Sequence, residues 1–161
     1  MTTFEDALAE LGSALARIAA AYERDRSLRE DLLQEILLAL FRALPALADR
    51  TKLRAFAFRI AHNRCVDHVI RQAAAPRATE LPDKIASDDP SPEEALLAGE
   101  RAERLLEAMR TLELPYRQVM TLVLEDLSYV EIAETLGISL ANVGVRVNRA
   151  KSRLKAALNH E

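Results

Sequence analysis

The chain has 161 residues, a formal net charge of −3 and a composition that is half hydrophobic. Its apolar stretches are interrupted by charge before they reach the roughly 18 residues that a membrane span needs, and Glu5 and Asp6 stand where a signal peptide would be basic. The single cysteine, Cys65, excludes a disulfide within the chain. We therefore expect a cytoplasmic protein without a membrane segment.

The first 72 residues carry three helical patterns, in which apolar residues recur at steps of three and four. The patterns run over Phe4–Tyr22, Leu28–Leu44 and Phe56–Val69, and Ser27 is the expected N-cap of the second. Ala, Leu, Arg and Glu dominate the composition, Gly is rare, and no stretch alternates with a period of two. The predicted fold class is therefore all-α.

A change of composition divides the chain into two small helical domains. Four of the six prolines fall in residues 76–92 beside Ser, Thr and Asp, which is typical of a flexible linker. Residues 76–100 contain seven acidic residues and only two basic ones. We predict an N-terminal domain over residues 1–72, an acidic linker over 73–92 and a C-terminal domain over 93–161.

The C-terminal domain is predicted to contain two helices, around residues 96–109 and 119–124, followed by a helix-turn-helix. The first helix of that motif begins with Ser128 and Glu131 at the spacing of a capping box. Gly137 suits the left-handed position that ends it, and Ser139 is a second N-cap three residues after Leu136. A turn of this length is typical of DNA-binding helix-turn-helix motifs.

The last helix has an apolar face and a polar face. Four apolar residues share one side: Val143, Val147, Ala150 and Leu154. The polar residues follow the same spacing, shifted by one: Asn142, Arg146, Arg149 and Arg153. Asn and Arg make bidentate contacts with purine edges in the major groove, and Arg also neutralises phosphates. The pattern predicts a DNA-reading helix; the alternative is a tight helical hairpin with a basic surface.

Positive charge is concentrated in two blocks. Residues 50–71 hold six basic residues against one acid, and residues 138–158 hold five basic residues and no acid. Two basic blocks separated by an acidic stretch indicate two contacts with a polyanion. Ordinary solvated helix faces are the alternative.

No pattern in the sequence indicates a catalytic or metal site. His62, Cys65 and His68 are spread around the predicted third helix and have no evident fourth ligand, so we interpret them as a histidine-bearing basic helix with a buried cysteine. No nucleophile–base order or phosphate-cradling glycine loop occurs. We expect a protein that is not an enzyme and that needs no cofactor or metal.

Segments in both domains resemble the extracytoplasmic-function (ECF) subfamily of bacterial RNA polymerase sigma factors. In the C-terminal domain the resemblance lies in residues 114–119 and in residues 127–139 with Asn142-Val143 and Arg149-Ala150 after them. In the N-terminal domain, residues 31–36 are similar to the family's polymerase-binding helix and residues 58–67 to its promoter-reading helix. The resemblance covers nearly the whole chain.

The resemblance implies a sigma factor that binds core RNA polymerase and promoter DNA and directs promoter recognition, melting and initiation. It places polymerase contacts at Asp31, Gln34, Glu35 and Leu38. It places contacts with the downstream (−10) element at Asn63, Arg64 and Asp67. Contacts with the upstream (−35) element fall on Asn142, Val145, Arg146, Asn148 and Arg149, with Arg117 as a phosphate contact. A non-template base is expected in a pocket near residues 49–52.

Three departures from the family pattern bear on regulation and specificity. Ala57 stands where the family usually has Trp, and we expect Phe56 and Phe58 to compensate by packing. The family often has a basic residue where Gly144 stands and a small polar one at Val145, which leaves the upstream target sequence open. The acidic run that usually precedes the polymerase-binding helix is diluted at residues 28–31.

This dilution suggests activation by a serine/threonine kinase rather than release from an anti-sigma factor. Thr51, between Arg50 and Lys52, is the candidate phosphosite; the alternative is that it merely caps the third helix. Three other functions compete with the sigma-factor interpretation. They are a stand-alone helix-turn-helix regulator, a sigma-like decoy that titrates an anti-sigma factor and, last, a helical hydrolase.

Overall fold

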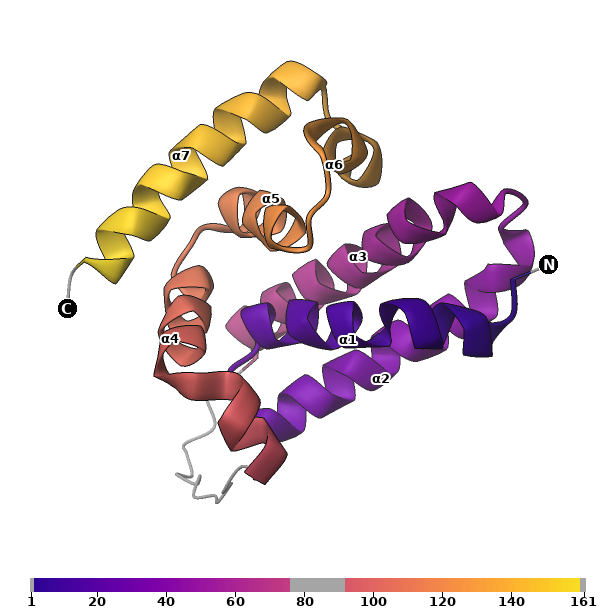
Figure 1. Cartoon of the computed structure of the whole chain (residues 1–161), viewed down its shortest axis with the longest axis horizontal. Helices are drawn as coiled ribbons and strands as arrows, with labels where there is room; N and C mark the ends of the chain where they lie inside the picture. Colours follow the sequence, from indigo (N-terminus) through magenta and orange to yellow (C-terminus); the bar gives the residue numbers. More distant parts are fainter. Residues whose placement is uncertain (1, 76–91, 160–161) are drawn as a thin grey trace.

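The computed structural model describes residues 2–75 and 92–159, with side chains from residue 99 onward in the second of these ranges. We call these ranges the first half and the second half. The first half contains α1 (Phe4–Tyr22), α2 (Arg26–Ala43), η1 (Leu44–Ala46), η2 (Arg50–Lys52) and α3 (Leu53–Ala74). The second contains α4 (Pro92–Arg110), α5 (Leu114–Leu124), α6 (Tyr129–Leu136) and α7 (Leu140–Leu158). Regular structure in both ranges is helical throughout (Figure 1), which confirms the all-α fold class.

The helix starts follow local capping, and one differs from the expectation. Thr3 and Asp6 form a capping box at the start of α1. Helix α2 begins at Arg26 with Asp25 as its N-cap, because the Asp25 carboxylate accepts a hydrogen bond from the Leu28 amide at 3.0 Å. The prediction of Ser27 as the cap is therefore wrong. The helix begins with the polar residues Arg26 and Ser27, which the apolar pattern starting at Leu28 does not include.

The predicted linker falls almost entirely on residues 76–91, outside the described residues. Its two ends are helical where they are described, because α3 continues to Ala74 and α4 begins at Pro92. Within α4, Gly99 has φ +57° and ψ 162°, so the helix axis breaks there. Glycine adopts this conformation without the strain that a side chain would add. Helix α4 contacts α1 and α7, and Ala108 and Met109 near its end are buried.

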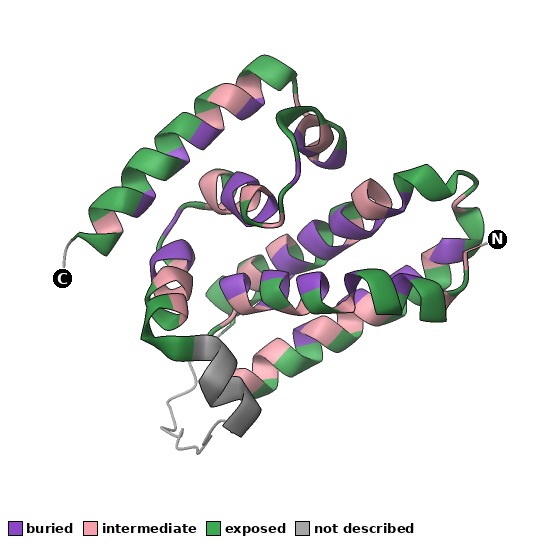
Figure 2. Cartoon of the chain, in the orientation of Figure 1, coloured by how far each residue is buried: buried purple, intermediate pink, exposed green. Residues whose placement is uncertain are grey.

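The two halves share one hydrophobic core. Buried apolar residues of the first half, such as Leu15, Ile36 and Phe58, belong to the same contiguous cluster as Met109 and Leu122 of the second half. Figure 2 shows that buried residues line the helix faces that look toward one another. Removing a buried leucine or phenylalanine side chain from such a core costs about 2–5 kcal/mol. The two halves are therefore packed against each other and are not two domains without mutual contact.

Helix α1 lies at the centre of this arrangement. It contacts α2 and α3 in its own half and α4 and α5 in the other (Figure 1). Many of its buried residues are alanines, among them Ala7, Ala14, Ala19 and Ala21. Small side chains let the neighbouring helices approach closely. A second contact between the halves joins α3 to α6.

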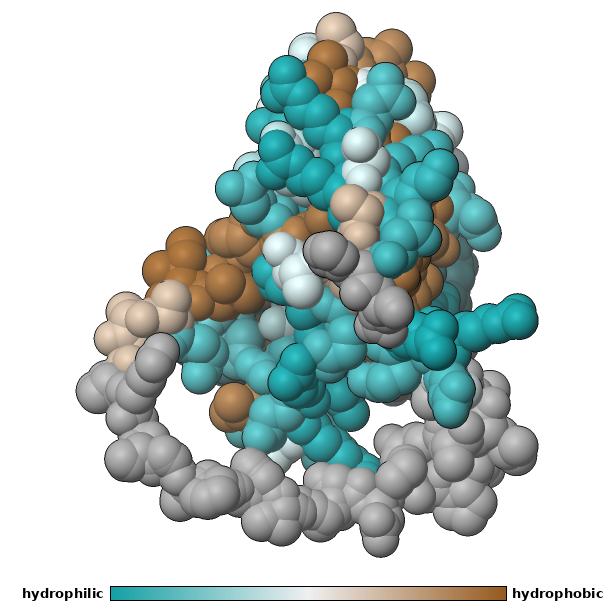
Figure 3. All heavy atoms as spheres, turned by 90° about the vertical axis from the view of Figure 1, so that its left-hand side faces the viewer, coloured by the Kyte–Doolittle hydropathy of each residue, from teal (hydrophilic) through white to brown (hydrophobic). Residues whose placement is uncertain are grey.

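The outer surface is largely hydrophilic on the side formed by α4 and α7. Figure 3 views this side, on which hydrophilic residues cover the middle and apolar ones gather at the left edge and at the top. Charged residues of α4 such as Glu100, Arg101 and Arg104 are exposed. None of the described helices combines the length and hydropathy that a bilayer crossing demands.

Candidate nucleic-acid interface

The predicted helix-turn-helix is formed by α6 and α7, and its caps are those expected. The Ser128 hydroxyl accepts a hydrogen bond from the Glu131 amide at 3.1 Å, and the Glu131 carboxylate accepts one from the Ser128 amide at 2.8 Å. Gly137 ends α6 with φ +71°, and its amide donates to the carbonyl of Ala133. The Ser139 hydroxyl accepts from the Asn142 amide at 3.1 Å and starts α7. All three predictions are confirmed.

The two faces of α7 separate as the sequence indicates. Its four apolar stripe residues are all buried: Val143, Val147, Ala150 and Leu154. They pack α7 against α5, α6 and α4. Figure 2 shows the opposite side of α7 exposed along its length. The helix is therefore anchored by one face and presents the other to solvent.

The side chains predicted to read DNA lie on the outer side of α7. Val145, Asn148 and Arg149 are exposed, and Asn142 and Arg146 are half-buried. Across the described part of the chain, neither Arg146 nor Arg149 has an ion-pair partner. Two free guanidinium groups and two amides on one face suit contacts with base edges and phosphates.

Arg153 lies on the same helix but is engaged within the second half. Its guanidinium pairs with Glu113 at 2.9 Å and lies 4.6 Å from the ring centroid of Tyr116. Arg153 therefore braces α7 against the start of α5, a role that helix spacing alone did not reveal.

Arg117, predicted to contact a phosphate, is turned toward the first half. Its Nη2 donates to the carbonyls of Arg110 and Leu112, both at 2.9 Å, and the guanidinium lies 5.2 Å from the ring centroid of Tyr22. Burial lowers the pKa of Arg117. A phosphate contact at this residue stays a prediction.

The residues predicted to meet the downstream element and the polymerase lie on exposed helix faces of the first half. On α3, Asn63, Arg64 and Asp67 are exposed. On α2, Asp31, Gln34 and Leu38 are exposed and Glu35 is half-buried. Glu35 pairs with Arg71 of α3 at 3.3 Å, so the two predicted surfaces adjoin.

The histidines and the cysteine of α3 point inward. His62 is fully buried, with Nδ1 3.1 Å from the Tyr22 hydroxyl and Nε2 3.3 Å from the Thr121 hydroxyl. His68 lies 2.7 Å from Glu23, and burial raises the pKa of the Cys65 thiol. In the ranges that the structure describes, no three potential ligands gather as a metal site would require. The interpretation of Cys65 as a buried residue is confirmed.

The aromatic residues beside Ala57 pack as expected. Ala57 and Phe58 are buried, and Phe56 is half-buried against the core. The core of the first half is therefore filled around the alanine.

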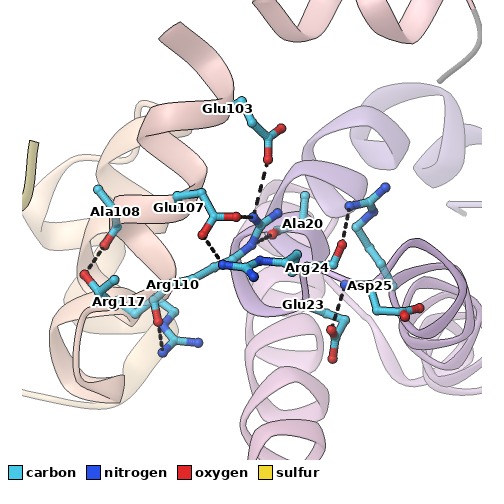
Figure 4. Close-up of polar contacts among 11 residues, drawn as sticks. Ala20, Glu23, Arg24, Asp25, Glu103, Glu107, Ala108, Arg110 and Arg117 are labelled. Atoms are coloured by element: carbon cyan, nitrogen blue, oxygen red, sulfur yellow. Dashed lines mark hydrogen bonds and ion pairs between the residues drawn. The ribbon is translucent and has the colours of Figure 1, made fainter. Parts of the chain in front are cut away.

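A cluster of charged residues joins α1 to α4. Figure 4 shows Arg24 and Arg110 meeting at the carboxylate of Glu107, and Arg110 also donates to the carbonyl of Ala20 at 2.9 Å. The hydrogen bond from Arg24 lowers the pKa of Glu107. Neither this cluster nor the contact between His62 and Thr121 was foreseen, because each joins residues far apart in the sequence.

A second cluster joins the basic block of the first half to α5 and α6. Lys52 pairs with Glu134 at 2.7 Å, and Arg54 pairs with Glu131 at 3.7 Å. Arg17 of α1 forms two hydrogen bonds with the Glu125 carboxylate, at 2.7 and 2.8 Å. Part of the predicted polyanion-binding block therefore meets carboxylates of the same chain.

Thr51 lies exposed in η2 and does not cap α3. Its hydroxyl donates to the Asp49 carboxylate at 2.7 Å, and its amide donates to the same oxygen at 3.0 Å. Helix α3 has Lys52 at its N-cap, without a side-chain hydrogen bond. The alternative interpretation of Thr51 as the cap of the third helix is therefore wrong, because the residue is held by the preceding turn.

Both halves match models of known families. Residues 8–75 match sigma-70 region 2, and residues 102–154 match sigma-70 region 4. The RNA polymerase sigma factor CnrH of Cupriavidus metallidurans is 29% identical over 97% of this chain and 86% of its own length. The ECF RNA polymerase sigma factor SigM of Bacillus subtilis is 30% identical over 89% of this chain and 87% of its own.

A solved structure shares the arrangement of both halves. CnrH in complex with the cytosolic domain of CnrY superposes with a TM-score of 0.72 at 26% identity, covering 98% of this chain and 88% of CnrH. The family matches, the relatives and the helix-turn-helix lead to one assignment. The chain belongs to the ECF subfamily of RNA polymerase sigma factors.

Proposed function

We propose that this sigma factor docks on core RNA polymerase through α2, reads the downstream promoter element with α3 and reads the upstream element with α7. The observation that carries the proposal is the division of α7 into a buried apolar stripe and an exposed Asn/Arg face. A helix held in this way presents a fixed set of donors to a major groove. The polymerase supplies the nucleotidyl transfer.

The polymerase contact is assigned to the exposed strip on α2. Asp31, Gln34 and Leu38 follow one another at three- and four-residue steps, so they share one helix face. Leu38 is 48% exposed, whereas Leu32, Ile36 and Leu40 on the opposite face of α2 are buried. An exposed apolar side chain beside polar ones suits a protein–protein contact, in which an apolar core is surrounded by a polar rim.

The downstream element is assigned to α3 and the turn before it. Asn63, Arg64 and Asp67 offer amide, guanidinium and carboxylate groups to an unstacked strand, and Lys52 and Arg54 add positive charge at the start of the helix. A basic groove that follows the backbone is the usual means of holding a single strand.

We propose that a serine/threonine kinase activates the protein at Thr51. The hydroxyl is exposed, and its hydrogen bond to Asp49 lowers the pKa of that carboxyl, so a phosphate here would stand beside a carboxylate. Repulsion between the two would release the cap of η2. Arg50 and Lys52, on either side, would receive the phosphate in exchange for their present carboxylate partners, Glu10 and Glu134.

An anti-sigma factor is the other candidate for control. It is supported by the likeness of the two-half arrangement to CnrH in its complex with the cytosolic domain of CnrY. The two mechanisms predict different behaviour of the purified chain. A chain controlled by an anti-sigma factor is active as purified, whereas one controlled by phosphorylation is not.

Run-off transcription with core polymerase and a promoter pool tests both the function and its control. We expect discrete transcripts that depend on the chain, more with Thr51→Asp than with Thr51→Ala; Ser13→Asp, at an exposed site on α1, is the matched control. Transcripts of equal strength from all three variants would exclude the kinase mechanism. A stand-alone regulator would instead bind promoter duplex without polymerase, and a decoy would yield no transcripts with any variant.

A further inference from the structure

Three carboxylates at the end of α5 and on α6 face the first half. We call Glu125, Glu131 and Glu134 the acidic edge. Figure 1 shows α6 lying beside the first part of α3, and the two helices are in contact. The acidic edge therefore adjoins the start of the basic block of residues 50–71.

Each carboxylate of the acidic edge meets a basic side chain of the first half. Glu134 pairs with Lys52, Glu131 pairs with Arg54, and Glu125 holds Arg17 through two hydrogen bonds. Arg54 also donates to the backbone carbonyl of Glu125 at 3.1 Å. Lys52 and Arg54 thus have the same kind of partner that a phosphate backbone would provide: an anionic oxygen within hydrogen-bonding or ion-pair distance.

The upstream-reading helix is not covered in the same way. Arg146 and Arg149 of α7 lack ion-pair partners within the described residues, and the outer face of α7 is exposed (Figure 2). In the basic block of α7, Arg146 and Arg149 are unpaired among the described residues, whereas Lys52 and Arg54 at the start of the other block are paired with carboxylates. The halves are already joined by apolar contacts. The ion pairs of Lys52 and Arg54 are therefore not needed to hold the halves together.

We infer that the acidic edge takes the place of promoter-strand phosphates at Lys52 and Arg54, so that the closed chain and the downstream single strand compete for the same side chains. This inference rests on the proposed function, since it assigns Lys52 and Arg54 to the single strand. The closed arrangement then holds back the downstream contact while leaving the upstream reader uncovered. Release of α6 from α3 is the step that admits the strand.

The contact is suited to a reversible closure. Lys52, Arg54, Glu131 and Glu134 are all partly exposed, and exposed ion pairs are individually weak and screened by salt. Glu125 differs, because its side chain is only 10% exposed and depends on Arg17 for charge compensation. Removing Arg17 would leave a poorly solvated carboxylate without its bidentate partner, which penalises the closed form.

Two variants test the inference because they change the net charge in opposite directions. Arg17→Gln removes a positive charge, and the double variant Glu125→Gln/Glu134→Gln removes two negative ones; both break acidic-edge pairs and leave the Ser128–Glu131 cap intact. The matched control, Glu5→Gln/Glu100→Gln, removes two exposed carboxylates outside the acidic edge. Binding of a fluorescent single-stranded oligonucleotide is measured by anisotropy without polymerase, and the radius of gyration by X-ray scattering.

We expect both acidic-edge variants to expand and to bind the oligonucleotide about three- to tenfold more tightly than the unaltered chain. The control should stay compact and change affinity by less than about twofold. Weaker binding by Arg17→Gln would show that net charge alone governs affinity and would overturn the inference. So would unchanged size in both variants, or expansion without tighter binding. Run-off transcription by the unaltered chain reports separately on the proposed function.

Discussion

The hydroxyl of Tyr22 in α1 lies 3.1 Å from Nδ1 of His62 in α3, and both side chains are buried. The other ring nitrogen of His62 lies 3.3 Å from the Thr121 hydroxyl of α5. A chain of three polar groups thus crosses from one half of the protein to the other inside the core. Burial raises the pKa of Tyr22 and lowers that of His62 to about 4. The imidazole is therefore neutral when the protein is folded at neutral pH.

The burial of His62 in this row of polar groups predicts that the folded protein loses stability in mild acid. The unfolded chain protonates His62 near pH 6.5, whereas the folded chain does so only near pH 4, so the unfolded state binds more protons between these values. Stability is complete above about pH 6.5 and falls as the pH decreases, by about 2 kcal/mol between pH 6.5 and 5. Urea unfolding at several pH values measures it. His62→Gln should remove this part of the pH dependence, and an unchanged slope in the variant would contradict the assignment.

Two glycines of the helix-turn-helix should respond oppositely to the same substitution. Gly137→Ala places a side chain at φ +71°, where it costs about 1–2 kcal/mol. Gly144→Ala adds a methyl group inside α7 with no atom within 4 Å, and should stabilise the protein by about 0.5–1 kcal/mol. Denaturant unfolding compares the two variants with the unaltered chain. Equal destabilisation would mean that α7 is not a regular helix at residue 144.

Upstream recognition should depend on α7. Arg149→Ala removes an unpaired guanidinium from the exposed face and should lower transcription from promoters with an intact upstream element about tenfold. Lys155→Ala, also exposed but nearer the end of α7, is the control and should have a small effect. Run-off transcription on promoters with and without the upstream element separates base reading from general attraction. An equal loss on both promoters would assign Arg149 to the phosphates alone.

Polymerase binding should depend on Leu38. Truncation to Ala removes apolar area that is half exposed in the isolated chain, so we expect unchanged folding and about fivefold weaker binding to core polymerase. Leu8→Ala on α1, where the side chain is 39% exposed, is the matched control. Competition for core polymerase against a labelled sigma factor gives both affinities. If the control weakens binding as much as Leu38→Ala, the docking strip is not on α2.

The elements that sequence predicted well are those fixed by short-range chemistry. The caps at Ser128 and Ser139, the left-handed Gly137 and the apolar stripe of α7 all depend on residues a few positions apart. The start of α2 was misplaced because Arg26 and Ser27 carry no apolar signal and Asp25 caps equally well. A local pattern is sufficient to predict a helix start where only one residue is suited to be the N-cap.

The contacts between the halves could not be predicted in the same way. Arg117 was assigned to a phosphate because the family resemblance implies a phosphate contact there, yet in the folded chain its guanidinium lies against Tyr22, far away in sequence. The same holds for Lys52, whose partner Glu134 lies on another helix of the other half. Which anion a cation meets depends on tertiary packing, and a single sequence carries no direct record of it.

The central position of α1 has a consequence for genetic studies of this protein. The helix contributes no residue to the predicted DNA-reading or polymerase-docking surfaces, yet it contacts helices of both halves through buried alanines such as Ala14 and Ala19. A bulkier residue at either position would wedge neighbouring helices apart. Screens for loss of promoter activity should therefore recover substitutions in α1 that touch neither nucleic acid nor polymerase, and their cluster would mark the packing between the two halves rather than a binding site.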